Sequence, residues 1–572
     1  MVWVEGHDIP VPPHDRGVPD KIAADGAEVL PRLPGWAIAE ALRHLPEDEL
    51  EQALRSRILP TANLPGLRLH ACFGRAAYAL ARRHGLNLVA GGHPADFLAA
   101  ARLALGPSLL REATFGLARR NDGYSARRRL TLPQIVCGLC GLAALVLAAL
   151  VLPPDFLWIA ASLLSGLFFL AVIALRLLCL LPPLPLPQVA APDLADADLP
   201  VYSVLVPLFR ETAVLGQLLG ALSRLSYPRD RLDIKLILEE SDIAMQRAVA
   251  QLRLPEHIEV VVVPCGSPQT KPRALNYALQ FARGELLTIF DAEDIPEPLQ
   301  LRLAAETFAL LSPDVACLQA ELTFYNANEN WLARQFTVEY ATLFGLLLPA
   351  LASYRLPLPL GGTSNHFRTR LLRRAGAWDA FNVTEDADLG LRLARLGFAA
   401  ATLDATTYEE ASIGLGNWLR QRSRWLKGFM QTWLVHMRSP ARTMEEVGVA
   451  GFWACQAYTA GLIASALLHP FCLGLTIWLI VSGRAFSAGA GLVDTLIAGL
   501  NLAVLFSGYA VTILAGRRAI RRKGIEGWYF TLASMPIYWL LISLAAWAAL
   551  RQFVVAPFHW NKTEHGLSSF QK

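Results

Sequence analysis

The sequence predicts an α/β domain with a doubly wound sheet, inserted between transmembrane helices and preceded by a small, mainly helical domain. Two observations support this fold class. Residues 130–154, 156–175 and 447–483 contain no charged side chain, and each stretch is long enough to cross a bilayer. Between them, residues 202–294 alternate between short strand-like runs and helix-like segments. Hydrophobic residues make up 54% of the 572 residues and charged residues only 17%, which is typical of a membrane protein with a sizeable soluble part.

The first 126 residues are expected to form a cytoplasmic, mostly helical domain. Residues 1–30 show no periodicity and predict a poorly ordered tail. Residues 46–59 begin with acidic side chains, end with arginine and carry leucines on one face, which indicates a helix. Further helices are expected over 74–86 and 95–105. This region contains no catalytic pattern, so we expect it to have a docking or stabilising role.

Two transmembrane helices are expected over 130–181, and the arginines at 127–129 place the preceding domain in the cytoplasm. Three to four more are expected over 447–556. In one interpretation residues 447–483 form two helices, interrupted at His469-Pro470, and spans follow at 495–516 and 528–550. The basic run at 517–523 then lies outside the cell, against the positive-inside tendency. In the other interpretation, residues 447–483 cross the membrane once, so that the basic run lies inside the cell. Part of 528–555 then lies in the membrane interface.

Cys137 and Cys140 form a CxxC pair inside an apolar run without acidic or histidine neighbours. We interpret them as small packing residues of a membrane helix and not as a metal or redox site.

The α/β domain is expected over 195–445. Buried strands are predicted at 202–209, 235–240, 259–264 and 285–294, with an intervening helix at 213–225. Strands at this spacing predict a parallel sheet, and ligands of such sheets bind at the carboxyl ends of the strands. Acidic residues follow two of these strands, so we expect the binding site there.

Several residues near these strand ends are candidates for binding a phosphorylated ligand. Lys271 precedes a predicted helix whose unpaired N–H groups would also attract an anion, although a Lys-Pro-Arg sequence suits an ordinary loop as well. The DAED run at 291–294 predicts a Mg²⁺ or Mn²⁺ site in which Asp291 and either Glu293 or Asp294 bind the metal. The acids that close the second strand are Glu239, Glu240 and Asp242, and solvated acids at a strand end are an equally good interpretation of each.

Two motifs farther along the chain lie between the apolar spans. In the TED motif at 384–386, Asp386 is the expected general base and Glu385 a second catalytic candidate, while Thr384 would alternatively cap a helix. The QRSRW motif at 421–425 places an amide, a guanidinium and an indole on adjacent helical turns. Arg424 is expected to bind a diphosphate leaving group, with Gln421 and Trp425 contacting the sugar donor.

The order DAED, TED, QRSRW resembles the processive family-2 glycosyltransferases, which include bacterial cellulose synthase and hyaluronan synthase. The resemblance runs from about residue 200 to the C-terminus. It implies a GT-A fold, with an acid of the second strand bound to the uracil or ribose of the donor. The sequence departs from the family at Glu239-Glu240, where Asp-Asp is commoner, and at Asp291-Ala292-Glu293, where the family has Asp-x-Asp. Residues 557–566 resemble a loop that closes over the donor.

The expected function is therefore a membrane-embedded inverting glycosyltransferase with a divalent metal. It would transfer sugar from a UDP-sugar, with UDP-glucose the expected donor, to a growing extracellular polysaccharide. The alternatives are a non-processive transferase to a lipid carrier and an inactive transferase-fold receptor or secretion scaffold. The expected location is a bacterial inner membrane, with a cytoplasmic catalytic domain, a cytoplasmic tail at 557–572 and possible export partners. A net charge of +4 is too small to indicate nucleic-acid binding.

Overall fold

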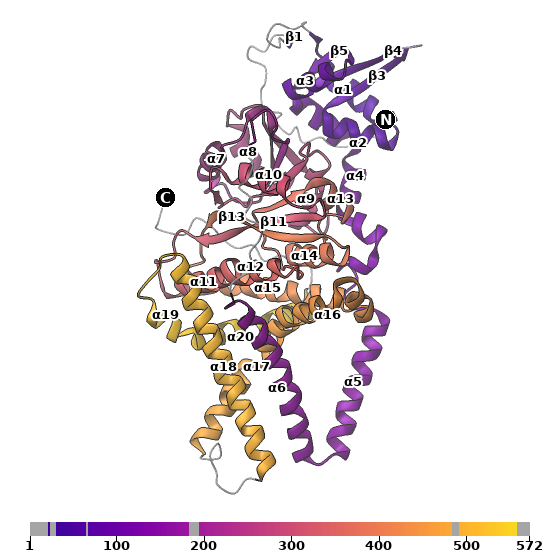
Figure 1. Ribbon diagram of the computed structural model, residues 1–572. Helices are drawn as coiled ribbons and strands as arrows, with labels where there is room; N and C mark the ends of the chain where they lie inside the picture. Colours follow the sequence, from indigo (N-terminus) through magenta and orange to yellow (C-terminus); the bar gives the residue numbers. More distant parts are fainter. Residues whose placement is uncertain (1–20, 23–29, 65–66, 182–193, 483–490, 557–572) are drawn as a thin grey trace.

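The computed structural model describes residues 21–22, 30–64, 67–181, 194–482 and 491–556 (Figure 1). The N-terminal domain lies at one end of the molecule, the α/β domain in the middle and a set of long helices at the other end. Almost all of the expected tail at 1–30, and the expected loop and tail at 557–572, lie outside the described residues.

The N-terminal domain combines helices with a small sheet. Helices α1 (Gly35–His44), α2 (Glu47–Ser56) and α3 (Arg75–Arg83) accompany a three-stranded sheet of β3 (Ile58–Leu64), β4 (Leu67–Phe73) and β5 (Asn87–Gly92). Two short strands, β1 (Lys21–Ile22) and β2 (Leu30–Pro31), pair beside it. Helices occur at the three expected places, but the sequence analysis missed the sheet. Two of its strands contain residues that weaken the pattern of a strand: β3 contains Pro and Asn, and β5 contains Asn and Gly.

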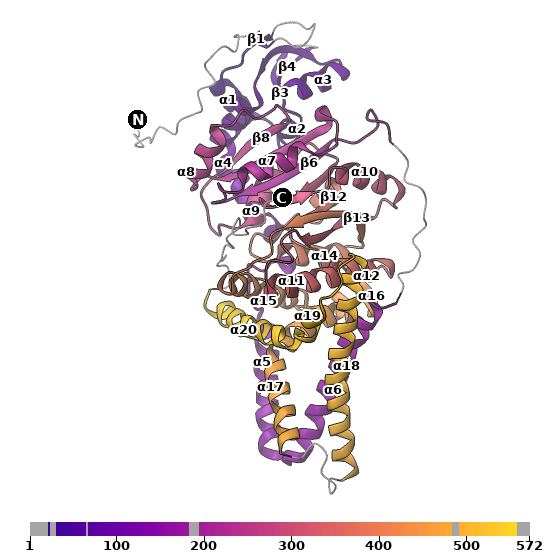
Figure 2. The same ribbon diagram turned by 90° about the vertical axis from the view of Figure 1, so that its left-hand side faces the viewer.

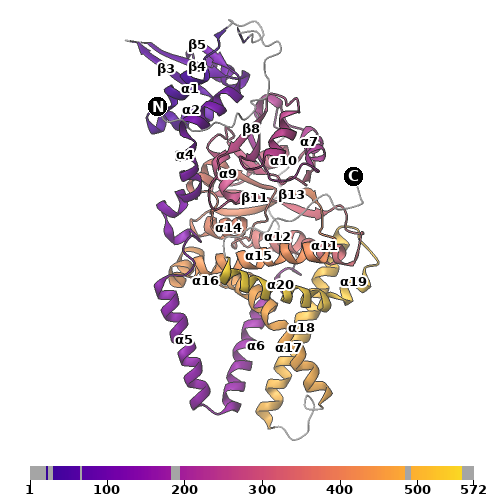
Figure 3. The same ribbon diagram turned by 180° about the vertical axis from the view of Figure 1, so that it is seen from behind.

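Helix α4 (Pro94–Arg120) is much longer than the helix expected at 95–105. It begins at a capping box in which the His93 ring accepts from the backbone of the first turn and Asp96 reaches back to the His93 N–H. From the N-terminal domain it runs along the α/β domain toward the membrane helices (Figure 3). Its backbone accepts side-chain hydrogen bonds from α9 (Lys271–Leu279), so the two helices are firmly attached.

The α/β domain contains an eight-stranded mixed sheet in the order β10-β13-β11-β12-β9-β6-β7-β8. The four predicted strands are present and pair in parallel: β6 (Tyr202–Leu208), β7 (Leu232–Glu239), β8 (Ile258–Val263) and β9 (Leu286–Ile289). Along β6, Val204 and Val206 belong to one apolar cluster and Leu205 to another, so both faces of the sheet are buried. The four expected strands are thus parallel as predicted, and the whole sheet is mixed because β12 (Asn365–Arg368) runs antiparallel between β9 and β11 (Val315–Phe324).

The remaining strands extend the sheet beyond β11. Strand β13 (Ala399–Glu409) pairs in parallel with β11, and β10 (Ile295–Pro296) pairs antiparallel with β13. The helices of this domain are α7 (Leu215–Ser223), α8 (Ile243–Ala250), α9, α10 (Gln300–Leu310), α11 (Trp331–Thr342), α12 (Leu348–Ser353), α13 (Thr369–Arg374), α14 (Glu385–Arg395) and α15 (Leu415–His436).

Four helices extend together away from the α/β domain (Figures 1 and 2): α5 (Leu132–Val151), α6 (Pro154–Leu178), α17 (Ala460–Val481) and α18 (Leu492–Arg522). Helices α11, α15, α16 (Pro440–Tyr458) and α20 (Met535–Val555) lie across their upper ends, and α19 (Tyr529–Ala533) precedes α20. By length and composition, six helices of the described chain are apolar enough to cross a membrane. One of them, Trp331–Ser353, is 56% buried against the rest of the molecule, so it is not a lipid-exposed span.

The structure corrects the expected path of the C-terminal helices. The interruption expected at His469-Pro470 is wrong, because α17 continues through Pro470 as a helix. The interruption lies at Thr459 instead, between α16 and α17. Membrane helices tolerate an internal proline, since neighbouring groups satisfy the freed carbonyl. The basic run at 517–523 lies against the α/β domain: Arg522 donates to the Gly345 carbonyl at 2.8 Å, and Lys523 pairs with Glu321 at 2.7 Å. These contacts exclude the interpretation in which this run and the α/β domain lie on opposite sides of the membrane.

Candidate active site

One cavity of about 1800 Å³ begins at the carboxyl ends of the central strands and contains most of the predicted site residues. Strand β7 ends at Glu239, β9 leads into Asp291, and β13 ends at Glu409. The other predicted residues on its wall come from the loop after Asp291, from the first turns of α9 and α14 and from the middle of α15. The predicted residues that line it are Glu239, Lys271, Asp291, Glu293, Glu385, Asp386, Gln421, Arg424 and Trp425.

The acids at the end of β7 divide between two environments. Glu239 is buried in the cavity wall and accepts from Arg273 Nη2 at 2.6 Å, and burial raises the pKa of its carboxyl group. Glu240 faces the N-terminal domain instead: its Oε1 accepts from Arg102 at 2.5 Å and its Oε2 accepts from the Cys265 N–H at 2.9 Å. Neighbouring residues of a strand point to opposite faces. Only Glu239 of this pair therefore lines the cavity.

Asp242 does not line the cavity either. Its Oδ1 accepts from the Met245 N–H at 3.1 Å and caps α8, and its Oδ2 accepts from the Arg210 N–H at 2.5 Å. These bonds give Asp242 a role in fixing two loops beside the cavity.

Lys271 connects two strand ends across the cavity. Its ammonium group pairs with Asp291 and donates to the Gly362 carbonyl at 2.8 Å. Burial disfavours its charge, but the attraction of Asp291 and Glu385 nevertheless holds its pKa above the ordinary value. Lys271 is therefore a fixed positive charge beside the carboxylates, a suitable partner for a diphosphate.

The two acids that were alternatives for binding a metal lie differently. Glu293 lines the cavity with Asp291, and burial, followed by the charge of Asp291, raises its pKa to about 8. Asp294 lies outside the lining: its Oδ2 accepts from the Asp291 N–H at 2.7 Å and from the Thr363 hydroxyl. Asp294 thus closes the turn that presents Asp291.

The structure supports only part of the alternative explanation of the TED motif as a helix cap. Thr384 occupies the N-cap position of α14, but its side chain makes no capping hydrogen bond. Its hydroxyl instead lies against α15, where a Cβ on Gly428 would meet Thr384 Oγ1 at 2.4 Å. The absence of a side chain at Gly428 therefore lets α14 and α15 approach closely, which places the TED and QRSRW motifs side by side.

Asp386 is a half-buried carboxylate in the cavity wall. A Cβ on Gly362 would lie 3.3 Å from Asp386 Oδ2, so the glycine keeps the approach to this carboxylate open. Burial raises the pKa of Asp386, and burial together with Asp386 raises that of Glu385 to about 7. Arg424 is half-buried near them; its partial burial lowers its pKa, while Glu385 and Asp386 favour its charged form.

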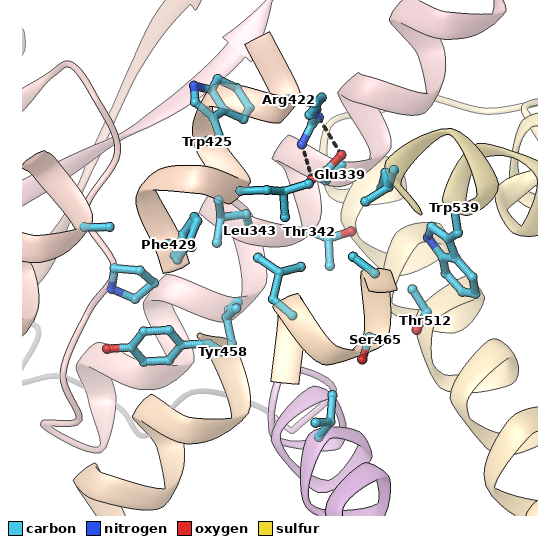
Figure 4. Close-up of a pocket in the computed structure, with 18 of the residues that line it drawn as sticks. Glu339, Thr342, Leu343, Arg422, Trp425, Phe429, Tyr458, Ser465, Thr512 and Trp539 are labelled. Atoms are coloured by element: carbon cyan, nitrogen blue, oxygen red, sulfur yellow. Dashed lines mark hydrogen bonds and ion pairs between the residues drawn. The ribbon is translucent and has the colours of Figure 1, made fainter. Parts of the chain in front are cut away.

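Trp425 belongs to an aromatic group on the cavity wall. Its ring stacks on Tyr340 with centroids 6.2 Å apart and meets Phe336 edge-on at 5.8 Å. Arg422 lies 4.8 Å from the Trp425 ring and binds both oxygens of Glu339 at 2.6 Å (Figure 4). The Tyr538 hydroxyl also donates to Glu339 at 2.9 Å. This network joins α15, α11 and α20 directly under the predicted site.

Sequence reasoning missed this network and also Glu409. Burial, and then the charges of Asp294 and Glu293, raise the pKa of Glu409 well above its ordinary value. The available signal was the Glu409-Glu410 pair that follows a strand-like run, the same pattern that drew attention to Glu239. Glu339 and Arg422 gave no local signal, because their partners come from distant helices.

The sequence comparison finds a family match within the central α/β domain. Residues 200–428 match the family described as "Glycosyltransferase like family 2".

Three curated relatives are similar to less than half of this chain. "Probable glycosyltransferase YdaM" of Bacillus subtilis is 26% identical over 40% of this chain and 56% of its own length. "Probable glucomannan 4-beta-mannosyltransferase 15" of Arabidopsis thaliana is 26% identical over 36% and 40%. "Beta-monoglucosyldiacylglycerol synthase" of Synechocystis is 27% identical over 44% and 52%. The chain thus spans about half the length of the curated relatives it matches.

Among solved structures, a mannosyltransferase from Pyrobaculum calidifontis in complex with GDP-Man and Mn²⁺ is 19% identical. The alignment covers 69% of this chain and 98% of that one, with a TM-score of 0.42.

Proposed function

We propose that this protein is an inverting glycosyltransferase that moves a sugar from a nucleotide sugar to a hydroxyl group at the membrane surface. The observation that supports it is one cavity at the carboxyl ends of the strands in which a lysine, an arginine and several carboxylates meet. Cations suited to a diphosphate and a carboxylate suited to proton removal are the two requirements of a single displacement.

In this proposal Asp386 removes the proton of the acceptor hydroxyl as its oxygen attacks the anomeric carbon. The bond between that carbon and the donor diphosphate breaks, and the nucleoside diphosphate leaves. Arg424 and Lys271 stabilise the charge that builds on the leaving group. Glu239, held by Arg273, contacts the nucleoside, and Gln421 and Trp425 contact the sugar. Glu385 supports the negative environment that keeps Arg424 charged.

The residues present fit a divalent cation. Asp291 and Glu293 both line the cavity, and their mutual repulsion is what such a cation would relieve. In the described part of the chain, no three Asp, Glu, His or Cys side chains converge on a metal site. Mg²⁺ is commonly bound by one or two carboxylates together with substrate phosphates, which suits this pair. A bound Mg²⁺ or Mn²⁺ would neutralise charge on the diphosphate.

Two acceptors are candidates. The first is a growing extracellular polysaccharide, with UDP-glucose as donor, which the order of motifs and the similarity to a glucomannan mannosyltransferase support. The second is a lipid, which the extension of the cavity among the long apolar helices supports. In both cases the catalytic domain faces the cytoplasm of a bacterial inner membrane, and a polysaccharide would need export partners.

The decisive experiment measures nucleotide release by the purified protein in nanodiscs with a panel of UDP- and GDP-sugars. We expect release with one or a few donors in Mg²⁺ or Mn²⁺, loss in excess EDTA, and a similar loss in Asp291→Asn. The exposed Asp404→Asn is the matched control and should keep wild-type release. If no donor releases nucleotide, the inactive receptor or scaffold replaces this proposal.

A further inference from the structure

The cavity that contains Asp386 continues into the region of the long apolar helices. Beyond Trp425 and Phe429 of α15 it is lined by Ser465 of α17, Thr512 of α18 and Trp539 of α20 (Figure 4). Helix α6 contributes lining residues from Arg176 to Trp158. At about 1.5 Å per residue, the helix rises about 27 Å between these two positions, close to the thickness of a hydrocarbon layer.

Polar side chains in the wall of this membrane part are already paired within the protein: Arg176 donates to Thr512, and Asn501 donates to Ser162 at 3.3 Å. The wall therefore offers few hydrogen-bond donors to a ligand. Four hydroxyl side chains in it already donate to the backbone of their own helix: Ser165, Thr476, Thr495 and Thr512. Most other lining side chains are aliphatic, aromatic or glycine. A polysaccharide has hydroxyl groups on every ring, and they would lose their water partners here without replacement. An alkyl or isoprenoid chain makes no hydrogen bonds to water, so it loses none when it enters such surroundings.

A group of polar aromatic residues lies where the membrane part meets the catalytic part. His469 Nε2 and the Tyr509 hydroxyl are 2.9 Å apart, and the Trp539 ring stacks on Tyr509 with centroids 5.2 Å apart. His469 Nδ1 is buried and has no hydrogen-bond partner among the described residues. Aromatic side chains with polar atoms are typical of the level of lipid headgroups.

We infer that the space between α6, α17 and α18 binds the hydrocarbon chain of a hydroxyl-bearing membrane lipid, which is the acceptor of the transferase. This inference rests on the proposed function for the role of the lipid as acceptor. The chain occupies the apolar wall, the headgroup meets His469, Tyr509 and Trp539, and the hydroxyl reaches Asp386. A hydroxyl acceptor is favoured over a lipid phosphate, because only a hydroxyl needs a base to remove its proton.

The reaction on this lipid balances without a further reactant. The lipid oxygen forms a bond to the anomeric carbon while the bond from that carbon to the diphosphate breaks. The hydroxyl proton passes to Asp386, and the electron pair leaves with the nucleoside diphosphate.

The test is photolabelling of the purified full-length protein in nanodiscs with a diacylglycerol that carries a diazirine in its acyl chain, without any sugar donor. We expect labelled peptides from α6, α17 and α18, and competition by unlabelled diacylglycerol. Ser465→Trp fills the cavity and should abolish this labelling. The matched control is Leu468→Trp on the same helix, since Leu468 is exposed and does not line the cavity; it should label like the wild type.

Chromatographic elution and helical content of both variants show whether they fold. Equal labelling of folded Ser465→Trp, or competition by soluble β-glucan oligosaccharides instead of diacylglycerol, would overturn the inference. Competition by a polyprenyl phosphate alone would overturn the hydroxyl class.

Transfer is then measured with a radioactive donor. Sugar in the organic phase is expected for wild type, with a loss of about a hundredfold in Ser465→Trp because the acceptor is displaced. Labelling needs no sugar donor, so the lipid site can be detected even if the transferase proposal fails. Conversely, nucleotide release by a protein that is not labelled contradicts only the lipid site.

Discussion

Asp386 is the residue whose environment matters most for the proposed chemistry. It lies in the first turn of α14, half-buried beside Glu385 and within the field of Lys271 and Arg424. Burial disfavours its charge and so makes it a stronger base than an exposed aspartate, while the two cations keep it from becoming permanently protonated. This balance is what a general base requires near neutral pH.

Substitution of Asp386 by asparagine keeps the shape of the side chain but removes its ability to accept a proton. We expect Asp386→Asn to lower sugar transfer by about a hundredfold or more. Binding of the donor, measured by calorimetry, should change little, because the leaving group contacts Lys271 and Arg424. Near-normal transfer in this variant would show that another group acts as the base.

The pH dependence of transfer follows from the same burial. The base acts as a carboxylate, and burial raises the pKa of Asp386 while that of Glu385 rises to about 7. A raised carboxyl pKa means that the charged form is lost as pH falls through that raised value. The acid limb of kcat/KM should therefore lie above about pH 3.9, the ordinary value for aspartate. A profile that stays flat down to about pH 3.9 contradicts this assignment.

At the scale of elements, α4 and the segment that follows it support three places around the site. Its Arg102 holds Glu240 at the end of β7, and its backbone accepts from Asn276 and Gln280 of α9, the helix that begins with Lys271. Beyond α4, the Ala126 N–H donates to Asp379 at 2.5 Å in the loop before α14. The N-terminal domain is thereby connected to the donor side and the base side of the cavity.

The Arg102–Glu240 pair predicts an effect on donor binding. Loss of Arg102 frees Glu240 and loosens the strand end that also carries Glu239. Arg102→Ala should raise the KM for the donor about threefold, the scale of a partly exposed ion pair, with a smaller change in kcat. Arg102→Lys should restore part of the affinity. The exposed Arg111→Ala on the same helix is the control, and an equal effect there would contradict the prediction.

At the scale of the whole molecule, the arrangement of helices determines which side of the membrane each segment occupies. Helices α5, α6, α17 and α18 extend together, whereas α20 lies across them against α15 and α17. We propose four crossings, with the N-terminal domain and the end of α20 on the side of the α/β domain. The basic run at 517–523 then lies on the cytoplasmic side, in agreement with the positive-inside tendency.

This topology predicts the behaviour of fusions at the C-terminus. Green fluorescent protein fused after Lys572 should fluoresce in cells, and alkaline phosphatase fused at the same position should be inactive. A control fusion after Val151, between α5 and α6, should give the opposite result. An active phosphatase after Lys572 would mean that α20 crosses the membrane.

The sequence by itself determined the features that depend on local order. The alternation of strands and helices, the acids at the ends of β7 and β9, and the TED and QRSRW motifs were all visible, because periodicity and strand ends are properties of a few consecutive residues. The uncharged stretches likewise predicted apolar helices. They did not predict whether lipid or protein covers a helix, because hydropathy measures only that water is excluded.

Only the tertiary structure decided what lies opposite each side chain. In the folded protein Glu239 lines the cavity, whereas Glu240 pairs with Arg102. Asp294 closes a turn. Glu409 and the Glu339–Arg422 pair also belong to the site. It also laid α20 across the membrane helices and continued the cavity between α6, α17 and α18. These outcomes depend on packing between elements far apart in the chain, for which local sequence carries no signal.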